Sequence, residues 1–68
     1  MNEETFNLSI RKFLKMVGVN SQRTIEQAVA KSRAAGLISG NETFPVKVTL
    51  EIANLGLTEK FTGEIRLE

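Results

Sequence analysis

The sequence predicts an α+β fold in which two N-terminal helices pack on one face of a C-terminal antiparallel β-hairpin, in the order α-α-β-β. Up to about residue 35, apolar residues recur every three or four positions, which is the spacing of a helix. From Phe44 onward they alternate with polar residues, which is typical of half-buried strands. Breaks that contain glycine separate the segments, at Gly18, Gly36–Gly40 and Asn54–Gly56. With 68 residues, the chain is long enough for one small domain over residues 1–68.

The first helix is predicted over about residues 3–17. Asn2 can cap its start, and the acidic residues that follow Asn2 suit the positive end of the helix dipole. Gly18 is predicted to end the helix in a left-handed conformation. The residues expected on the buried stripe are Phe6, Ile10, Phe13, Leu14 and Val17.

The second helix is predicted over about residues 22–35. Ser21 is a good N-cap residue, and Gly36 offers a C-terminal stop. Its stripe consists mostly of small side chains, so this helix is expected to bury little area per residue. The stripe residues are Ile25, Ala28, Val29, Ser32 and Ala35.

The hairpin is predicted from strands over about residues 44–53 and 58–67. Apolar residues are even-numbered in the first strand and odd-numbered in the second. The apolar residues of both strands lie on one side of the sheet only if the numbers of each pair of opposite residues sum to an odd value. Two registers meet this condition with a short loop, and their sums are 109 and 111. We predict 111, which places Glu51 opposite Lys60 and makes Asn54–Leu57 the loop.

The composition excludes several kinds of chemistry. Apolar residues make up 41% and charged residues 25%, which is ordinary globular usage, but the chain has no His, Cys, Asp, Tyr or Trp. Thiolate catalysis, disulfides and cysteine or histidine metal sites are therefore excluded, and general base catalysis would need a Glu or Lys with a shifted pKa. Ser9 and Lys12 match the Ser-x-x-Lys spacing of penicillin-recognising enzymes, but their other motifs are absent. We expect no enzyme, no cofactor and no metal.

Two further stretches indicate neither a phosphate-binding loop nor a targeting segment. Gly36–Gly40 is rich in glycine, but it lacks the Lys-Ser/Thr pair of a phosphate loop and follows no strand, so we expect a connector. The start Met1-Asn2-Glu3-Glu4 is the reverse of a basic signal sequence, and no apolar run is long enough to cross a membrane. We therefore expect a cytoplasmic protein.

Nucleic-acid binding is the alternative function that the sequence leaves open. The two predicted helices and the hairpin could mimic a winged helix-turn-helix, but Leu14, Thr24 and Gln27 do not fit its spacing around Gly18. A net charge of +1 is also far from the basic excess of a DNA-binding domain. The residues that would make such a contact are Arg11, Lys12, Lys15, Arg23, Lys31 and Arg33.

Protein–protein contact is the function that we rank first. Leu8 projects about 160° from the centre of the first stripe, where a polar residue is expected. A two-stranded sheet leaves both edges open to a further strand; Pro45 suits an edge, whereas the second strand has no proline. Either a homodimer or capture of another protein would use this edge or the Leu8 face, and a monomer with protected edges stays equally open. The candidate contact residues are Leu8, Lys60, Thr62, Glu64 and Arg66.

Four stretches resemble a family of short bacterial proteins catalogued as a domain of unknown function. The resemblance spans nearly the whole chain and implies a bacterial protein that is complete at this length. It brings no assigned activity and no functional residues. The stretches are Ile10–Val19, Ser21–Arg23, Ile38–Gly40 and Gly63–Ile65.

Overall fold

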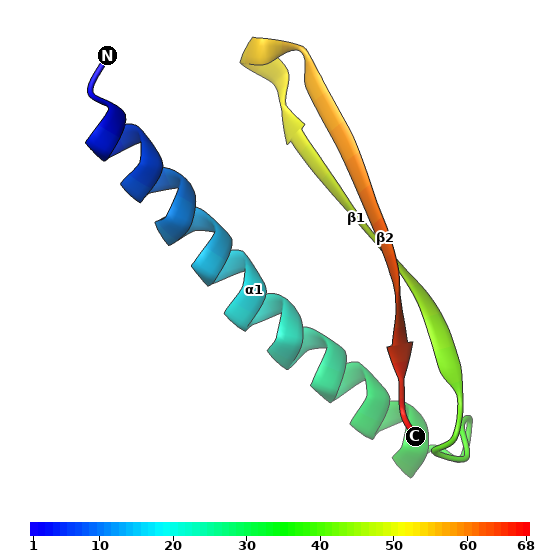
Figure 1. Ribbon diagram of the computed structural model, residues 1–68. Coiled ribbons are helices and arrows are strands. Elements are labelled where there is room, and N and C mark those ends of the chain that lie inside the picture. The colour runs from blue at the N-terminus through cyan, green and yellow to red at the C-terminus, as the bar shows by residue number, and fades with distance from the viewer. The chain divides into compact units, whose positions relative to one another are not determined.

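The computed structural model describes all 68 residues and contains one long helix followed by a β-hairpin (Figure 1). The chain divides into two units, Met1–Ala35 and Gly36–Glu68, which are described separately below. The α+β class and the C-terminal hairpin are confirmed. The elements are α1 (Glu3–Ala34), β1 (Thr43–Ile52), the short 3₁₀ helix η1 (Ala53–Leu55) and β2 (Leu57–Arg66).

The prediction of two helices is wrong, because α1 is a single helix of 32 residues. Gly18 was expected to stop the first helix and Ser21 to cap the second, yet both lie inside α1, and Gly18 has no positive φ. Glycine in a helix interior costs only about 1 kcal/mol relative to alanine. A break would instead expose the unpaired backbone groups of two new helix ends. The Thr24 hydroxyl, which donates to the Asn20 carbonyl oxygen at 2.9 Å, also lies within this continuous helix.

The apolar stripe also favours one helix. At 100° per residue, the stripes predicted for the two shorter helices differ in mean direction by only about 50° when they are placed on one axis. A continuous α1 therefore presents one stripe that passes through Ser21 and Thr24 and joins its large N-terminal side chains to its smaller C-terminal ones.

The predicted ends of the helical region are confirmed. The Asn2 side chain accepts a hydrogen bond from the Thr5 N–H at 3.0 Å, as an N-cap does. At the other end the Ala35 N–H donates to the Lys31 carbonyl oxygen at 3.1 Å. Gly36 follows with φ of 74°, which is the left-handed conformation that favours glycine after a helix.

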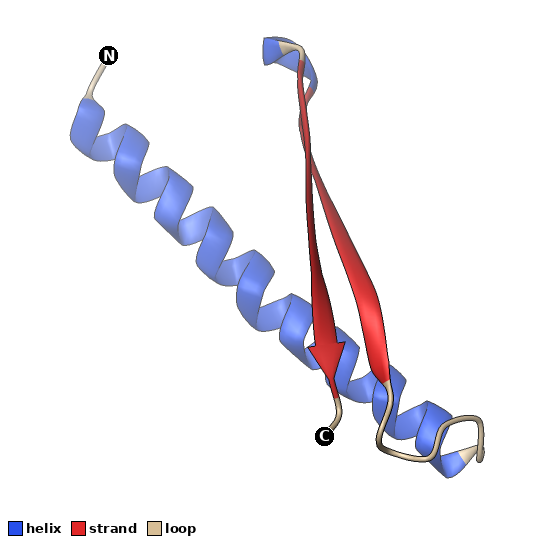
Figure 2. Ribbon diagram, turned by 45° about the vertical axis from the view of Figure 1, so that its right-hand side comes forward, coloured by secondary structure: helices blue, strands red, loops and turns tan.

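In the hairpin, the paired residue numbers sum to 109, so the predicted sum of 111 is wrong. Ile52 pairs with Leu57, and the loop is Ala53–Gly56 rather than Asn54–Leu57. The fourth loop residue, Gly56, has φ of 60°. In the other register this left-handed position would fall on Leu57, which has a Cβ and is disfavoured there. Figure 2 shows the two strands as a twisted ribbon.

Candidate interaction surfaces

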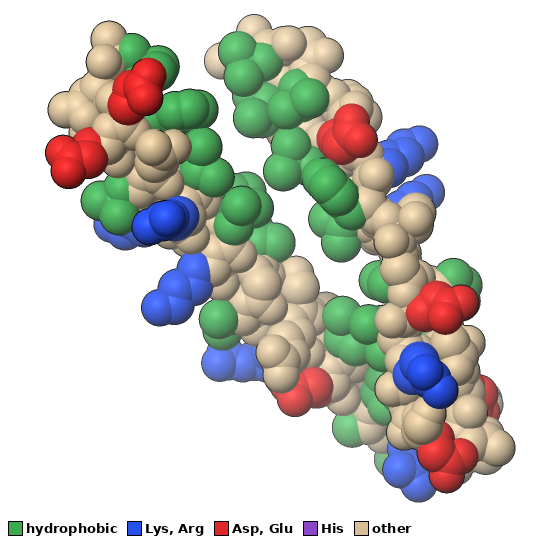
Figure 3. All heavy atoms as spheres, in the orientation of Figure 1, with side chains coloured by type: hydrophobic (Ala, Val, Ile, Leu, Met, Phe, Trp, Pro, Cys, Tyr) green, Lys and Arg blue, Asp and Glu red, His purple; other side chains and the backbone are tan.

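The hairpin has one apolar and one polar face. Residues opposite each other in an antiparallel pair point to the same side, so the observed register places Phe44 and Ile65 on the same face as Val48 and Phe61. Only Glu59 and Gly63 interrupt the apolar residues on that face, and the opposite face carries Pro45 and polar or charged residues alone. Figure 3 shows apolar side chains gathered along one side of the hairpin. The eight apolar residues are Phe44, Val46, Val48, Leu50, Ile52, Leu57, Phe61 and Ile65.

None of these side chains is fully buried. No residue of the chain is buried, and Phe61 and Val48 are 57% and 48% exposed. Full burial of one such side chain stabilises a protein by about 1.5–3 kcal/mol. The apolar face is therefore the largest source of binding energy that the hairpin offers.

The hydrogen-bonding pattern shows which backbone groups lie on the free edges. The Leu67 N–H donates to the Glu42 carbonyl oxygen at 3.0 Å, so this pair is directly hydrogen-bonded. Directly bonded and non-bonded pairs alternate along an antiparallel ladder. The even-numbered residues of β2 therefore direct their N–H and C=O groups outward, away from β1. These residues are Thr58, Lys60, Thr62, Glu64 and Arg66.

Four of the five predicted contact residues lie together on this edge. Lys60, Thr62, Glu64 and Arg66 carry outward backbone groups and place their side chains on the polar face. On the other edge, the matching outward position of β1 is Pro45, paired with Glu64, and proline has no N–H to donate. Only the β2 edge therefore offers an uninterrupted row of donors.

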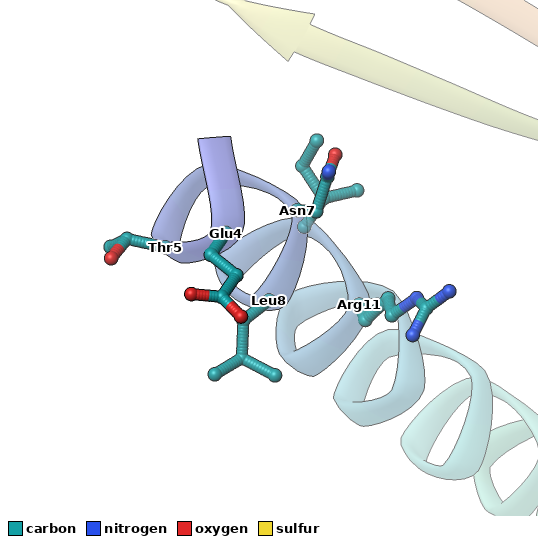
Figure 4. A pocket seen from close by; sticks show the side chains of 6 residues that line it. Glu4, Thr5, Asn7, Leu8 and Arg11 are labelled. Atoms are coloured by element: carbon teal, nitrogen blue, oxygen red, sulfur yellow. The ribbon is translucent and has the colours of Figure 1, made fainter. Parts of the chain in front are cut away.

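Leu8, the fifth predicted contact residue, belongs to the other unit. It lies on α1 and is 59% exposed. It borders a depression together with its helical neighbours, and Figure 4 shows that Leu8, Asn7 and Arg11 point in different directions from the axis. All the lining residues come from one stretch of helix, whose side chains diverge, so they enclose no binding pocket. The lining residues are Glu4, Thr5, Asn7, Leu8, Ile10 and Arg11.

The stripe of α1 is the second apolar surface. Its large side chains are about half exposed, with Phe6 at 50% and Phe13 at 53%. Ile10 and Leu14 continue the same side of the helix. An amphipathic helix gains most of its stability from packing of this kind of stripe rather than from helix propensity.

The six basic residues that were considered for nucleic-acid contact do not form one patch. Arg11 and Lys15 lie one turn apart, but Arg23 and Lys31 point elsewhere. At 100° per residue, the six positions spread over about 200° around the helix axis. Figure 3 shows Lys and Arg side chains at separate places along α1.

The connector between α1 and β1 binds a carboxylate of its own chain. The Glu42 carboxylate accepts from the Ser39 N–H at 2.9 Å, the Gly40 N–H at 2.9 Å and the Ser39 hydroxyl at 3.2 Å. These backbone hydrogen bonds, first from Ser39 and then from Gly40, lower the pKa of Glu42 to about 2. Backbone amides that would suit an external anion are thus already occupied.

Replacement of Glu42 by glutamine is expected to lower the stability of the hairpin unit at neutral pH. A carboxyl whose pKa is depressed in the folded state stabilises that state above its unfolded pKa. The contribution is lost as the pH falls from 4.5 to about 2. Thermal unfolding across this range should show a smaller loss of stability for Glu42→Gln than for the natural chain. Glu51→Gln, on the exposed polar face, is the matched control. Equal acid sensitivity of the natural chain and Glu42→Gln would contradict the role of this carboxylate.

A family of unknown function, DUF6494, matches residues 1–68, the whole chain. The chain belongs to this family. The match confirms the family resemblance read from the sequence and assigns no activity. No curated protein and no solved structure shows detectable similarity to the chain.

Two features of this DUF6494 chain were missed at the sequence level. Glu42 was not singled out, and no sequence signal marks it, because glutamate is not among the residues whose side chains commonly cap turns. Gly63 was not singled out either, although it interrupts the apolar alternation of the second strand.

No helix combines the length and the apolar sequence needed to cross a membrane, and no three carboxylates cluster as metal ligands would.

Proposed function

We propose that this chain is a non-enzymatic, cytoplasmic bacterial interaction domain that works by self-association, with a second copy as its partner. The observation that carries the proposal is the two-stranded sheet with eight apolar side chains on one face. An isolated two-stranded hairpin is at best marginally stable in water, and three or more strands with an apolar face, or packing against a helix, are needed. A second copy supplies further strands.

The lengths of the two apolar surfaces support a second copy. At 1.5 Å per residue, the 32-residue helix runs for about 48 Å. At 3.3 Å per residue, a ten-residue strand runs for about 33 Å. The helix that carries the stripe is therefore about 15 Å longer than either strand of the hairpin, so the hairpin of one chain is too short to match α1 along its whole length.

Charge also permits self-association. The chain carries nine basic and eight acidic residues, for a net charge of +1, so two copies repel each other only weakly. The scattered basic residues of α1 give less support to nucleic-acid binding, because that function depends on a concentrated positive surface.

Sedimentation equilibrium over a range of protein concentrations tests the proposal. We expect the mass of two chains at high concentration and reversible dissociation on dilution, since apolar association follows mass action. The same sample is titrated with a short DNA duplex at low salt. A single-chain mass at every concentration, or duplex binding that weakens steeply with salt, would overturn self-association in favour of a monomer or of nucleic-acid binding.

A further inference from the structure

We propose that two copies join through antiparallel pairing of their β2 strands, with the two-fold axis at Thr62. The inference rests on the self-association proposed above and specifies its interface. It gives a four-stranded sheet in the order β1-β2-β2-β1, with both apolar faces on the same side. That sheet exceeds the three strands that an independent sheet needs.

The free backbone groups select β2 and limit its registers. Residues from Thr58 to Arg66 with even numbers direct their donors and acceptors outward. Symmetric antiparallel pairing must therefore place even-numbered residues opposite even-numbered residues. On β1, Pro45 removes an outward donor from the corresponding row.

Charge complementarity then selects Thr62 as the centre. With the axis there, Lys60 faces Glu64 of the second copy, and the symmetry repeats this pair. An axis at Lys60 or Glu64 would place two like charges opposite each other, and an axis at Gly63 would place Lys60 opposite Arg66. An axis at Phe61 forms no pair of unlike charges. Among these neighbouring registers, only the Thr62 register pairs opposite charges within β2 and places no like charges opposite each other.

The apolar face supports the same register independently. With the axis at Thr62, Phe61 lies opposite Gly63 of the second copy on both sides of the axis. A Cβ built on Gly63 would lie 3.8 Å from Val46 Cγ1, an ordinary contact, so the hairpin itself does not require glycine here. An aromatic ring that packs over a cross-strand glycine covers its exposed backbone. The interface thus accounts for a glycine that the single chain leaves unexplained.

Charge reversal tests the register. Lys60→Glu and Glu64→Lys each turn both unlike pairs into like pairs, and we expect each to weaken the dimer about tenfold. The double variant carries both reversals in one chain, so a dimer of two such copies restores both unlike pairs. An equal mixture of the two single variants restores them between chains, so we expect mixed dimers to form as tightly as the natural ones. Equal weakening in the mixture and in the separate variants would overturn the proposed register.

Disulfide cross-linking provides a second readout. The chain has no cysteine, so Thr62→Cys introduces a single thiol on the axis. Directly bonded antiparallel pairs have Cα atoms about 5.5 Å apart, which suits a disulfide. We expect rapid formation of a covalent dimer under mild oxidation. Thr49→Cys, on the same sheet face but on β1, is the matched control and should cross-link slowly.

These experiments distinguish a failure of the proposed self-association from a failure of the proposed β2 interface. If sedimentation shows a dimer but Thr62→Cys cross-links no faster than Thr49→Cys, self-association stands and the β2 interface is wrong. If sedimentation shows only single chains, self-association itself is wrong, and the β2 interface falls with it.

Discussion

Replacement of Val48 by aspartate is expected to abolish cooperative folding or to lower the free energy of unfolding by about 3 kcal/mol or more. Val48 lies at the centre of β1, opposite Phe61, on the apolar face of the hairpin. Val48 is half-exposed in the single chain, and we expect the apolar face to be covered in the associated form, where the variant would place an unpaired charge out of water. Urea unfolding followed by circular dichroism measures the effect.

Thr49→Asp is the matched control for this experiment. Thr49 is the next residue of the same strand, lies opposite Lys60, and belongs to the polar face. The substitution adds the same charge and carries the same low strand propensity, so we expect a change of at most about 1 kcal/mol. Equal destabilisation by the two substitutions would show that both faces are in water, and it would count against any interface on the apolar face.

Replacement of Gly18 by proline is expected to cost about 3 kcal/mol, because proline removes a hydrogen bond and clashes with the preceding turn of α1. The helical signal at 222 nm should fall. Gly18→Ala should instead raise the free energy of unfolding by about 1 kcal/mol, since Gly18 has a helical backbone and a Cβ there would meet nothing within 4 Å.

Glu3→Pro is the control for the proline variant. Glu3 is the first residue of α1, where the missing N–H has no helical partner to lose. It should leave the helical signal nearly unchanged. A left-handed turn at Gly18, as the sequence first indicated, would instead make Gly18→Ala destabilising, because a Cβ is disfavoured at positive φ.

The candidate interaction surface could be predicted only in part from the sequence. Alternation along the chain identified the two faces of the hairpin, because the side-chain period of a strand is two and needs no tertiary information. The contact residues on β2 were named because the second strand has an open edge and no proline; they are Lys60, Thr62, Glu64 and Arg66. Alternation does not show which of their backbone groups point outward, because this depends on the hydrogen-bonding phase of the ladder.

The hairpin register shows the same limit. Sums of 109 and 111 both keep the apolar residues on one face, and cross-strand pairs that differ by a few tenths of a kcal/mol could not separate them. In the register with the sum of 109, the left-handed position of the loop falls on Gly56. This advantage belongs to the conformation of the loop and is not seen when single cross-strand pairs are compared.

The sequence by itself determined the α+β class, both ends of the helical region and the two-faced hairpin, since each depends on local periodicity and capping. The structure alone decided that Gly18, Ser21 and Thr24 lie within one helix. The physical reason is that local stop signals are worth about 1 kcal/mol, whereas a helix that continues keeps its backbone hydrogen bonds and a single apolar stripe.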